Sequence, residues 1–191
     1  MKKIILAGFG YLGKFIEQQA DFNEKKVLYK LSRNPDKHCN GFGNHIEVDF
    51  DKEKFDITKI VGESTIIYMA PPNKDKDGDP RLENFLNNIK KSNIERIVYI
   101  STSGVYGDCG GLSVTEDAEL RPLTDRAKKR VIAEKMIMKY SAVCNTNYVI
   151  LRVPGIYGLG RLPLSKVRER EPLIIKDECK ITNLINVEDL A

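Results

Sequence analysis

The stretch Lys2-Lys3-Ile4-Ile5-Leu6-Ala7-Gly8-Phe9-Gly10-Tyr11-Leu12-Gly13 opens the chain and decides its fold. A short apolar run leads into glycines spaced Gly8-x-Gly10-x-x-Gly13, and an apolar-periodic segment follows. A strand, a tight glycine turn and a helix start in this order are typical of a dinucleotide site, because glycines let the pyrophosphate approach the backbone and the helix N-terminus attracts it. We therefore predict that the cofactor is bound by Gly8, Phe9, Gly10, Tyr11, Leu12 and Gly13.

The composition is that of an ordinary globular chain. Its 191 residues, 41% of them hydrophobic, predict a single domain over residues 1–191 with a substantial core. The net charge of +4 is mild, and the basic residues are scattered among 27 acidic ones, which argues against nucleic acid as a partner. The sequence has no apolar run near the ~20 residues that span a bilayer and no secretory signal, so we expect a cytoplasmic protein without a membrane partner.

The four cysteines are not paired at metal-ligand spacing. Cys39, Cys109, Cys144 and Cys179 are predicted to be free thiols in a reducing compartment. His38 lies beside Cys39 but has no second cluster nearby, so a surface turn is the preferred interpretation and no metal site is predicted.

Apolar runs alternate with helical patterns along the chain. Strands are predicted at 3–7, 26–31, 46–48, 65–69, 96–101 and 148–153, and helices at 12–20, 52–60, 82–92 and 125–143. This alternation predicts an α/β fold, with a doubly wound parallel sheet covered on both faces. The loop at 107–122 is polar and glycine-rich, and it is expected where α/β enzymes place substrate loops, outside the carboxyl ends of the strands.

Three further segments carry a second signal. Residues 98–108 read VYISTSGVYGD, residues 151–161 read LRVPGIYGLGR and residues 185–191 read INVEDLA. With the glycine turn, they resemble the extended short-chain dehydrogenase/reductase superfamily, and within it the NAD-dependent epimerase/dehydratase group. The resemblance implies a Rossmann domain, a nicotinamide cofactor and a small-molecule substrate, often a sugar nucleotide.

The resemblance also implies roles for single residues. Thr102 matches the position whose hydroxyl bonds the substrate oxygen that loses or gains hydride, with Ser103 as a second candidate; the alternative is a hydroxyl that caps a strand end. Pro154 matches the stretch that passes the nicotinamide. Tyr106 and Tyr157 are the nearest candidates for a substitute acid, although the first is chiefly a substrate-loop or packing residue in the family.

The usual catalytic pair is replaced. The superfamily normally has a Tyr followed four residues later by a Lys, and extended members often have a Glu four residues after that. Counting back from Glu134 puts Arg130 in the place of the Lys and Arg126 in the place of the Tyr, and none of the eight tyrosines has a Lys four residues later. A guanidinium, with a pKa above ~12, cannot shuttle protons near neutral pH. The two arginines share a helix face suited to ribose, phosphate or carboxylate groups; the alternative is a solvated basic run.

With the loss of the Tyr/Lys pair, a departure in the glycine turn resembles the atypical members of this superfamily, which keep the cofactor fold and often lack that pair. Ala7 lies where extended members have their first glycine. The chain also stops at 187–191, where their small substrate-binding domain normally begins, so we expect the C-terminal substrate subdomain to be short or missing. Family members often dimerise through the fourth and fifth helices, which leaves a homodimer open.

The end of the second predicted strand bears on the cofactor. It offers Ser32 and Arg33, about twenty residues past Gly13, where NAD binders usually have an acid. An arginine suits a 2′-phosphate, so NADP is favoured over NAD. Asp49 matches the family aspartate that contacts the adenine, and Ala70 follows the fourth strand and is expected to line the cofactor cleft.

Two functions remain in view. The first is an NAD(P)-dependent oxidoreductase, epimerase or dehydratase acting on a nucleotide sugar or a small carbonyl or hydroxyl compound. Thr102 would orient this substrate, and Arg126 or Arg130 would supply electrostatic stabilisation. The alternative is a non-catalytic regulatory protein that responds to NADP(H), and the loss of the Tyr/Lys pair favours it.

Overall fold

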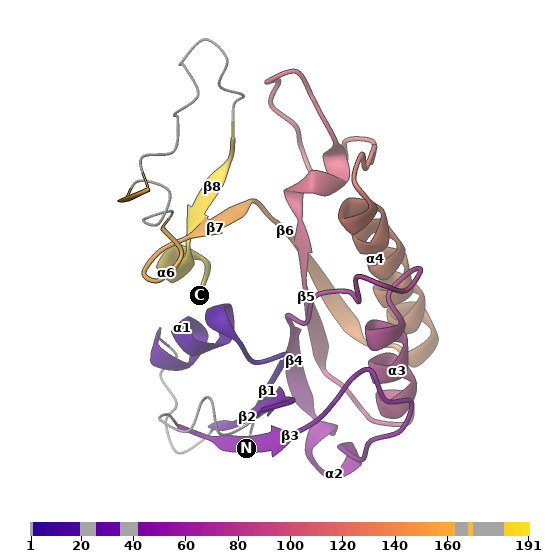
Figure 1. Cartoon of the computed structure of the whole chain (residues 1–191). Helices are drawn as coiled ribbons and strands as arrows, with labels where there is room; N and C mark the ends of the chain where they lie inside the picture. The colour runs from indigo at the N-terminus through magenta and orange to yellow at the C-terminus, as the bar shows by residue number, and fades with distance from the viewer. Residues whose placement is uncertain (1, 20–25, 35–41, 163–167, 170–181) are drawn as a thin grey trace.

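Six parallel strands form the central sheet (Figure 1). The computed structural model describes residues 2–19, 26–34, 42–162, 168–169 and 182–191. The strands are β1 (Lys2–Ala7), β2 (Lys26–Ser32), β3 (Asn44–Glu47), β4 (Ser64–Tyr68), β5 (Arg96–Thr102) and β6 (Asn147–Val153). Their order is β3-β2-β1-β4-β5-β6, with the direction of winding reversed between β1 and β4. This confirms the doubly wound Rossmann sheet.

Helices cover both faces of the sheet (Figure 1). On one face lie α1 (Tyr11–Gln19) and α6 (Val187–Leu190), and on the other lie α2 (Thr58–Val61), α3 (Pro80–Ile89) and α4 (Asp125–Cys144). A 3-10 turn, η2 (Ser103–Tyr106), follows β5. Beyond β6, the short strand β7 (Gly155–Tyr157) pairs in parallel with β8 (Leu184–Asn186) next to α6.

The alternation of side chains along β1 divides the core between the two faces. Ile5 and Ala7 are fully buried in the larger cluster under α3 and α4, together with Phe85 and Ile137. Leu6 points the other way, into a smaller cluster under α1. Burying one such large apolar side chain stabilises the fold by about 1.5–3 kcal/mol, so the strand that carries the glycine turn is held from both sides.

Local capping places the two helices that flank the site. The Asp79 carboxylate accepts a hydrogen bond from the Leu82 amide at 3.2 Å at the start of α3, and a proline occupies the first turn. The Thr124 hydroxyl accepts from the Ala127 amide at 3.2 Å and so starts α4. Asn145 takes the left-handed conformation and ends that helix.

The helix predicted at 52–60 is wrong over most of its length, because only α2 (Thr58–Val61) is helical there. Phe50 and Phe55 pack on each other, and the Phe55 amide donates to the Asn88 side chain, so this stretch is tied to the core in an irregular conformation. The Asp56 carboxylate then accepts from the Thr58 amide at 3.0 Å as the helix begins. Tertiary packing has overridden a weak helical pattern.

Other predicted elements agree within a few residues. The predicted strand at 46–48 is Asn44–Glu47, and the predicted helix at 82–92 begins at Pro80 and ends at Ile89. The strand predicted at 148–153 begins one residue earlier, at Asn147, and residue 20 of the first predicted helix lies outside the described residues.

The described residues contain neither a membrane-spanning helix nor a metal-binding cluster. No helix among those residues combines the length and the apolar character needed to cross a membrane. The same residues hold no group of three His, Cys, Asp or Glu side chains that could bind a metal ion. Cys109 and Cys144 are free thiols, whereas Cys39, Cys179 and His38 lie outside the described residues.

Candidate dinucleotide site

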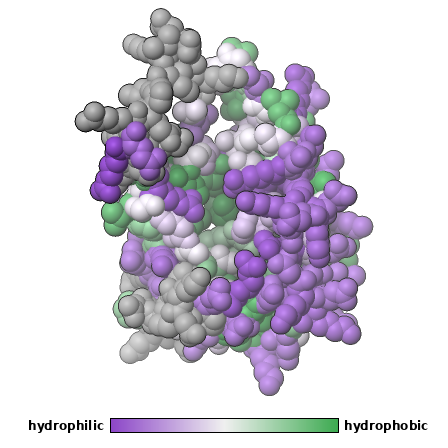
Figure 2. Space-filling view, viewed as in Figure 1, coloured by the Kyte–Doolittle hydropathy of each residue, from purple (hydrophilic) through white to green (hydrophobic). Residues whose placement is uncertain are grey.

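A cleft of about 480 Å³ opens at the carboxyl ends of β1, β4, β5 and β6. Figure 2 shows apolar side chains gathered in the middle of the viewed face, between two hydrophilic sides. The volume lies in the range of about 300–1,000 Å³ that ligand pockets occupy. The lining residues that the sequence predicts for the site are Gly8, Gly10, Tyr11, Leu12, Gly13, Arg126, Arg130 and Pro154. Ile156, which belongs with Pro154 to the stretch matched to the nicotinamide, also lines the cleft. The lining residues that the sequence does not place in the site are Met69, Pro71, Ile100, Ser101, Val153 and Arg161.

Gly8 makes the turn at the end of β1. Its φ is +83°, and a Cβ there would lie 2.6 Å from the Ala70 amide nitrogen, so only glycine fits without a backbone shift. The Gly8 and Phe9 amides both donate to the Leu31 carbonyl, at 3.0 and 2.8 Å. The turn is therefore fixed against the ends of two neighbouring strands, β2 and β4.

Gly10 faces open space at the start of α1. Its carbonyl accepts the first helical hydrogen bond, from Lys14 at 3.1 Å, and a Cβ at this position would meet nothing closer than the Gly8 carbonyl oxygen at 3.8 Å. The first amides of a helix have no partner within the helix and attract anions. Because protein atoms leave this position open, the residues present fit the pyrophosphate of a dinucleotide.

Phe9 supports the turn from below and does not line the cleft. It is 4% exposed, and the Lys30 ammonium lies 5.1 Å from the centre of its ring. Lys30 is itself buried and paired with Glu17 of α1 at 2.8 Å. Phe9 thus packs under the turn, so a direct contact between its side chain and a cofactor stays a prediction.

Arg161 packs on Tyr11 at the mouth of the cleft. The Arg161 guanidinium carbon lies 3.9 Å from the centre of the Tyr11 ring, and the Tyr11 hydroxyl donates to the Leu159 carbonyl at 3.0 Å. A Cβ on Gly158 would lie 2.9 Å from the same hydroxyl. These contacts hold the segment after β7 against the first turn of α1.

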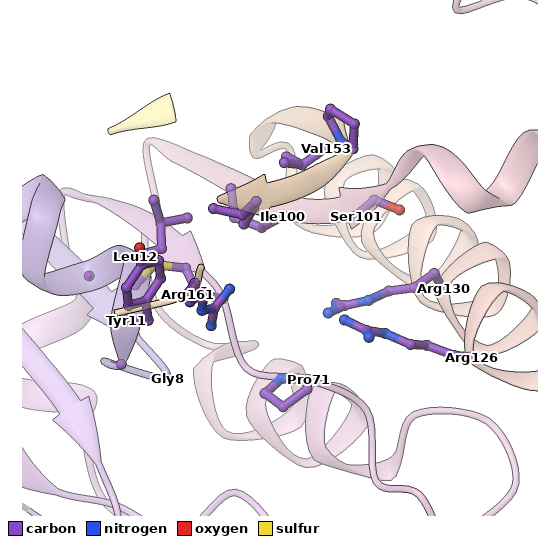
Figure 3. Close-up of a pocket in the computed structure, with 15 residues that line it drawn as sticks. Gly8, Tyr11, Leu12, Pro71, Ile100, Ser101, Arg126, Arg130, Val153 and Arg161 are labelled. Carbon is purple, nitrogen blue, oxygen red and sulfur yellow. The ribbon is translucent and has the colours of Figure 1, made fainter. Parts of the chain in front are cut away.

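The two α4 arginines point into the cleft from the opposite wall (Figure 3). Arg130 is 5% exposed, and its Nη1 donates to the Tyr99 hydroxyl at 2.7 Å. Arg126 is exposed at the rim, one helical turn earlier. The interpretation that both arginines are solvated therefore fails for Arg130, which lies in the interior.

Several buried polar groups lie near Arg130. The Tyr68 hydroxyl, the Asp79 Oδ2 atom and the Arg130 Nε atom are all buried without a hydrogen-bond partner among the described residues. Burial raises the pKa of Asp79 above its usual value, and it raises the pKa of Tyr99 to about 12. Tyr99 therefore stays protonated near neutral pH and holds Arg130 in place.

A second buried network anchors the loop beside the cleft. Glu134 is 1% exposed, accepts from the Ser101 hydroxyl and pairs with Arg152, whose Nη2 lies 2.9 Å from Oε2. Arg152 also donates to the Tyr106 hydroxyl at 2.9 Å and to the Glu116 carbonyl at 2.8 Å. This network ties α4, β5 and β6 to the loop at 107–122.

The predicted substrate-orienting residues lie beside the cleft and do not line it. The Thr102 hydroxyl accepts from the Gly104 amide at 3.3 Å, which is the strand-end cap of the alternative interpretation, and Ser103 begins η2. The Tyr106 ring packs on Arg152, with the guanidinium carbon 5.0 Å from the ring centre. A direct role for these three residues toward a substrate stays a prediction.

The residues predicted for the adenine end lie at the same edge of the sheet, outside the 480 Å³ cleft. Ser32 ends β2 and bonds His45 at 2.8 Å. Arg33 is 61% exposed, with its Nη1 3.7 Å from an Asp51 oxygen. Asp49 follows β3 and caps the next turn through the Asp51 amide. Ala70, which is predicted to line the cofactor cleft and not the adenine end, is buried against Gly8 and lies outside the 480 Å³ cleft.

Among the described residues that line the cleft, the ionisable side chains are Tyr11 and three arginines, and none is His, Cys, Asp or Glu. Arg161 and Ser101 are the polar lining residues that sequence reasoning does not assign. Both lie inside the quoted segments 98–108 and 151–161, so those motifs contained the signal, but the motifs did not show which side chain faces the cleft.

Comparison with known proteins agrees with this geometry. The model of the NAD dependent epimerase/dehydratase family matches residues 82–178. A putative UDP-arabinose 4-epimerase 4 from Arabidopsis thaliana is 29% identical over 83 residues, which are 40% of this chain and only 19% of that relative.

Solved structures share the fold over the whole chain. UDP-glucuronic acid 4-epimerase from Bacillus cereus in complex with NAD superposes with a TM-score of 0.79 and 21% identity, covering 100% of this chain and 71% of that one. MoeE5 in complex with UDP-glucose and NAD gives a TM-score of 0.77 and 19% identity, covering 100% and 69%.

Proposed function

The chain belongs to the NAD dependent epimerase/dehydratase family, and on this premise we propose that it binds a nicotinamide dinucleotide and acts on a sugar nucleotide. The observation that carries the proposal is the open position at Gly10, at the N-terminus of α1 and on the floor of the cleft. The NAD and UDP-sugar ligands of the structural neighbours support both halves of it.

Each wall of the cleft has a distinct task in this proposal. Gly10 and the first amides of α1 hold the pyrophosphate, and Arg161, stacked on Tyr11, adds a positive charge at the mouth. Arg130 and Pro154 lie toward the nicotinamide end. A bound nicotinamide supplies the hydride acceptor and donor, and the chain orients the substrate beside it.

The reaction proceeds without a tyrosine acid in this proposal. Arg126 or Arg130 stabilises developing negative charge on a substrate oxygen, because a guanidinium is a donor and does not accept protons. When the carbon of a substrate hydroxyl gives up hydride, the hydroxyl proton passes to water in the open cleft. Thr102 or Ser103 orients that oxygen, which requires the hydroxyl to turn from the strand end toward the cleft. Tyr106 is not needed as the acid, since its hydroxyl is held by Arg152.

We further propose a preference for NADP over NAD, resting on Ser32 and Arg33 at the end of β2. Arg33 is exposed and only loosely paired with Asp51, so its guanidinium is available to a 2′-phosphate. The structural neighbours were solved with NAD, which makes the comparison of the two cofactors informative. Arg33→Ala should weaken NADPH binding and leave NADH binding unchanged.

A regulatory binding protein is the second candidate. It is favoured because, in the described part of the cleft lining, Tyr11 is the one side chain besides the arginines that could give up or take up a proton as an acid or base. The double variant Arg126→Tyr with Arg130→Lys separates the two. An altered enzyme gains hydride transfer toward UDP-sugars, whereas a regulator keeps cofactor binding and gains no activity.

The first experiment is a titration with NADH and NADPH, followed by nicotinamide fluorescence. The chain has no tryptophan, so the signal is free of tryptophan emission. Saturable binding of either cofactor supports the proposal, and turnover of a UDP-sugar panel with NAD or NADP distinguishes enzyme from regulator. Binding of neither cofactor contradicts both candidates.

The domain organisation, the location and the oligomeric state belong to the same proposal. Residues 1–191 act as one cofactor-binding domain, and the free thiols of Cys109 and Cys144 agree with a cytoplasmic location. A homodimer is tested by light scattering of the purified chain.

A further inference from the structure

Three guanidinium groups of the described residues face the cleft, and no described carboxylate neutralises them at close range. Arg126 and Arg130 lie side by side on α4, and Arg161 faces them across the opening (Figure 3). Among the described residues, no carboxylate oxygen lies within 4.0 Å of any of the three. Arg81 and Arg152, outside the cleft, are each paired with an acid. The cleft therefore carries unpaired positive charge.

Arg130 is incompletely satisfied. Its side chain is 5% exposed, Nη1 donates to Tyr99, and Nε is buried with no partner among the described residues. Asp79 acts on it only from beyond ion-pair distance. A buried charged donor left without an acceptor is costly, so a ligand oxygen at this position would complete the site.

Arg126 lies one turn earlier on the same helix face and makes no hydrogen bond or ion pair to a described residue. Its guanidinium is thus free to turn toward the ligand that Arg130 binds. Two neighbouring planar forks match the two oxygens of a carboxylate or the oxygens of a phosphate.

The place of Arg126 and Arg130 in the cleft indicates which ligand supplies the oxyanion. The cofactor pyrophosphate belongs to the opposite wall, at Gly10 and the first amides of α1, where Arg161 stacks on Tyr11. An oxyanion that reaches Arg126 and Arg130 therefore comes from the second ligand.

We propose that Arg126 and Arg130 form a subsite for a carboxylate on the second ligand, so that the cleft selects an acidic sugar nucleotide over a neutral one. The inference rests on the proposed function, because it requires the dinucleotide to occupy the glycine turn. It assigns the two arginines a recognition task at the positions where the family normally carries its Tyr/Lys pair.

The test compares two ligands that differ at one group. UDP-glucuronate and UDP-glucose are titrated by calorimetry into protein saturated with NADH or NADPH. We expect UDP-glucuronate to bind at least about tenfold more tightly, equivalent to about 1.4 kcal/mol. High salt should reduce this preference, because Arg126 is exposed at the rim. Equal affinities, or no binding of either nucleotide, would overturn the proposal.

Arg126→Gln is the informative variant, because the Arg126 side chain is exposed and has no partner among the described residues whose loss would unfold the protein. It should remove most of the preference for UDP-glucuronate. The matched control is Lys135→Gln, which removes one charge from an exposed position about half a turn around α4 from Arg126. The control should keep the preference. A preference that survives Arg126→Gln contradicts the proposal.

Two further measurements distinguish failure of the carboxylate subsite from failure of the proposed function. If Arg126→Gln weakens binding of ADP-ribose, which carries the pyrophosphate without nicotinamide, and leaves the UDP-glucuronate preference intact, the oxyanion belongs to the cofactor and the carboxylate subsite is wrong. If wild-type protein binds neither NADH nor NADPH, the proposed function itself fails. Cofactor binding without a carboxylate preference refutes the subsite alone.

Discussion

Two glycines of the same turn should respond in opposite ways to a single methyl group. Gly10→Ala places its Cβ 3.8 Å from the nearest protein atom, so the fold accepts it. The alanine reduces the conformational freedom of the unfolded chain, which stabilises the folded protein by about 0.4–1 kcal/mol. Alanine is also a poorer N-cap residue than glycine, which destabilises α1 by a similar amount. We expect a melting temperature within about 4 °C of wild type. Gly10→Ala should nevertheless lose dinucleotide binding, because the methyl occupies the path of the pyrophosphate.

The expected loss of affinity follows from the hydrogen bonds that the phosphate would give up. A hydrogen bond to a charged group contributes about 1.5–3 kcal/mol, so losing one weakens NADH binding about 10- to 150-fold. Nicotinamide fluorescence measures this affinity, and circular dichroism on the same sample measures the melting temperature.

Gly8→Ala is the matched comparison. Its Cβ would lie 2.6 Å from the Ala70 nitrogen at a φ of +83°. The left-handed conformation costs about 1–2 kcal/mol and the overlap about 1–3 kcal/mol. At about 2–4 °C per kcal/mol, the melting temperature should fall by roughly 4–20 °C. Wild-type cofactor affinity in folded Gly10→Ala would refute the assignment of the turn to phosphate binding.

Three further predictions concern stability. Arg152→Leu leaves Glu134 buried without its counter-ion, and urea unfolding should show a loss of about 3–5 kcal/mol; a loss below about 1 kcal/mol would contradict the buried pair. Burial raises the pKa of Asp79, so its ionised form opposes folding above that pKa. Asp79→Asn, which keeps a capping oxygen, should therefore be more stable than wild type at pH 7, and urea unfolding at pH 7 and at about pH 4 should show this advantage shrinking at the lower pH. The Arg81 hydrogen bond lowers the pKa of Asp51, so this pair stabilises the fold above the unfolded pKa of about 3.9, and the stabilisation is lost as pH falls through the lower folded pKa. Arg81→Gln should lower the free energy of unfolding by up to about 1 kcal/mol at pH 7. A difference in unfolding free energy between variant and wild type that persists at pH 2 would argue against the pair.

The sequence predicted most of what depends on local pattern. Apolar runs identified the six sheet strands, and the glycine spacing identified the turn that the cleft contains. The prediction of a helix failed at 52–60, because Phe50 and Phe55 pack into a core that no local sequence pattern describes.

The walls of the site depend on contacts between distant segments. Ser101 lines the cleft and Thr102 caps the strand end, although the two hydroxyls are adjacent in the sequence. Which of them faces the cleft depends on how β5 sits between β4 and β6. Arg161 reaches the cleft through its contact with Tyr11, about 150 residues earlier in the chain, which the spacing of motifs cannot reveal.

The central position of β1 has a consequence for the order of folding. β1, which precedes its sheet neighbours in the sequence, pairs on both sides, with β2 through Lys3↔Val27 and with β4 through Lys3↔Ser64. Its second neighbour is thus some sixty residues away, and such non-local parallel pairing slows folding. The nascent glycine turn stays unformed until β4 has been synthesised and docked, so dinucleotide binding would report that the middle of the sheet is complete.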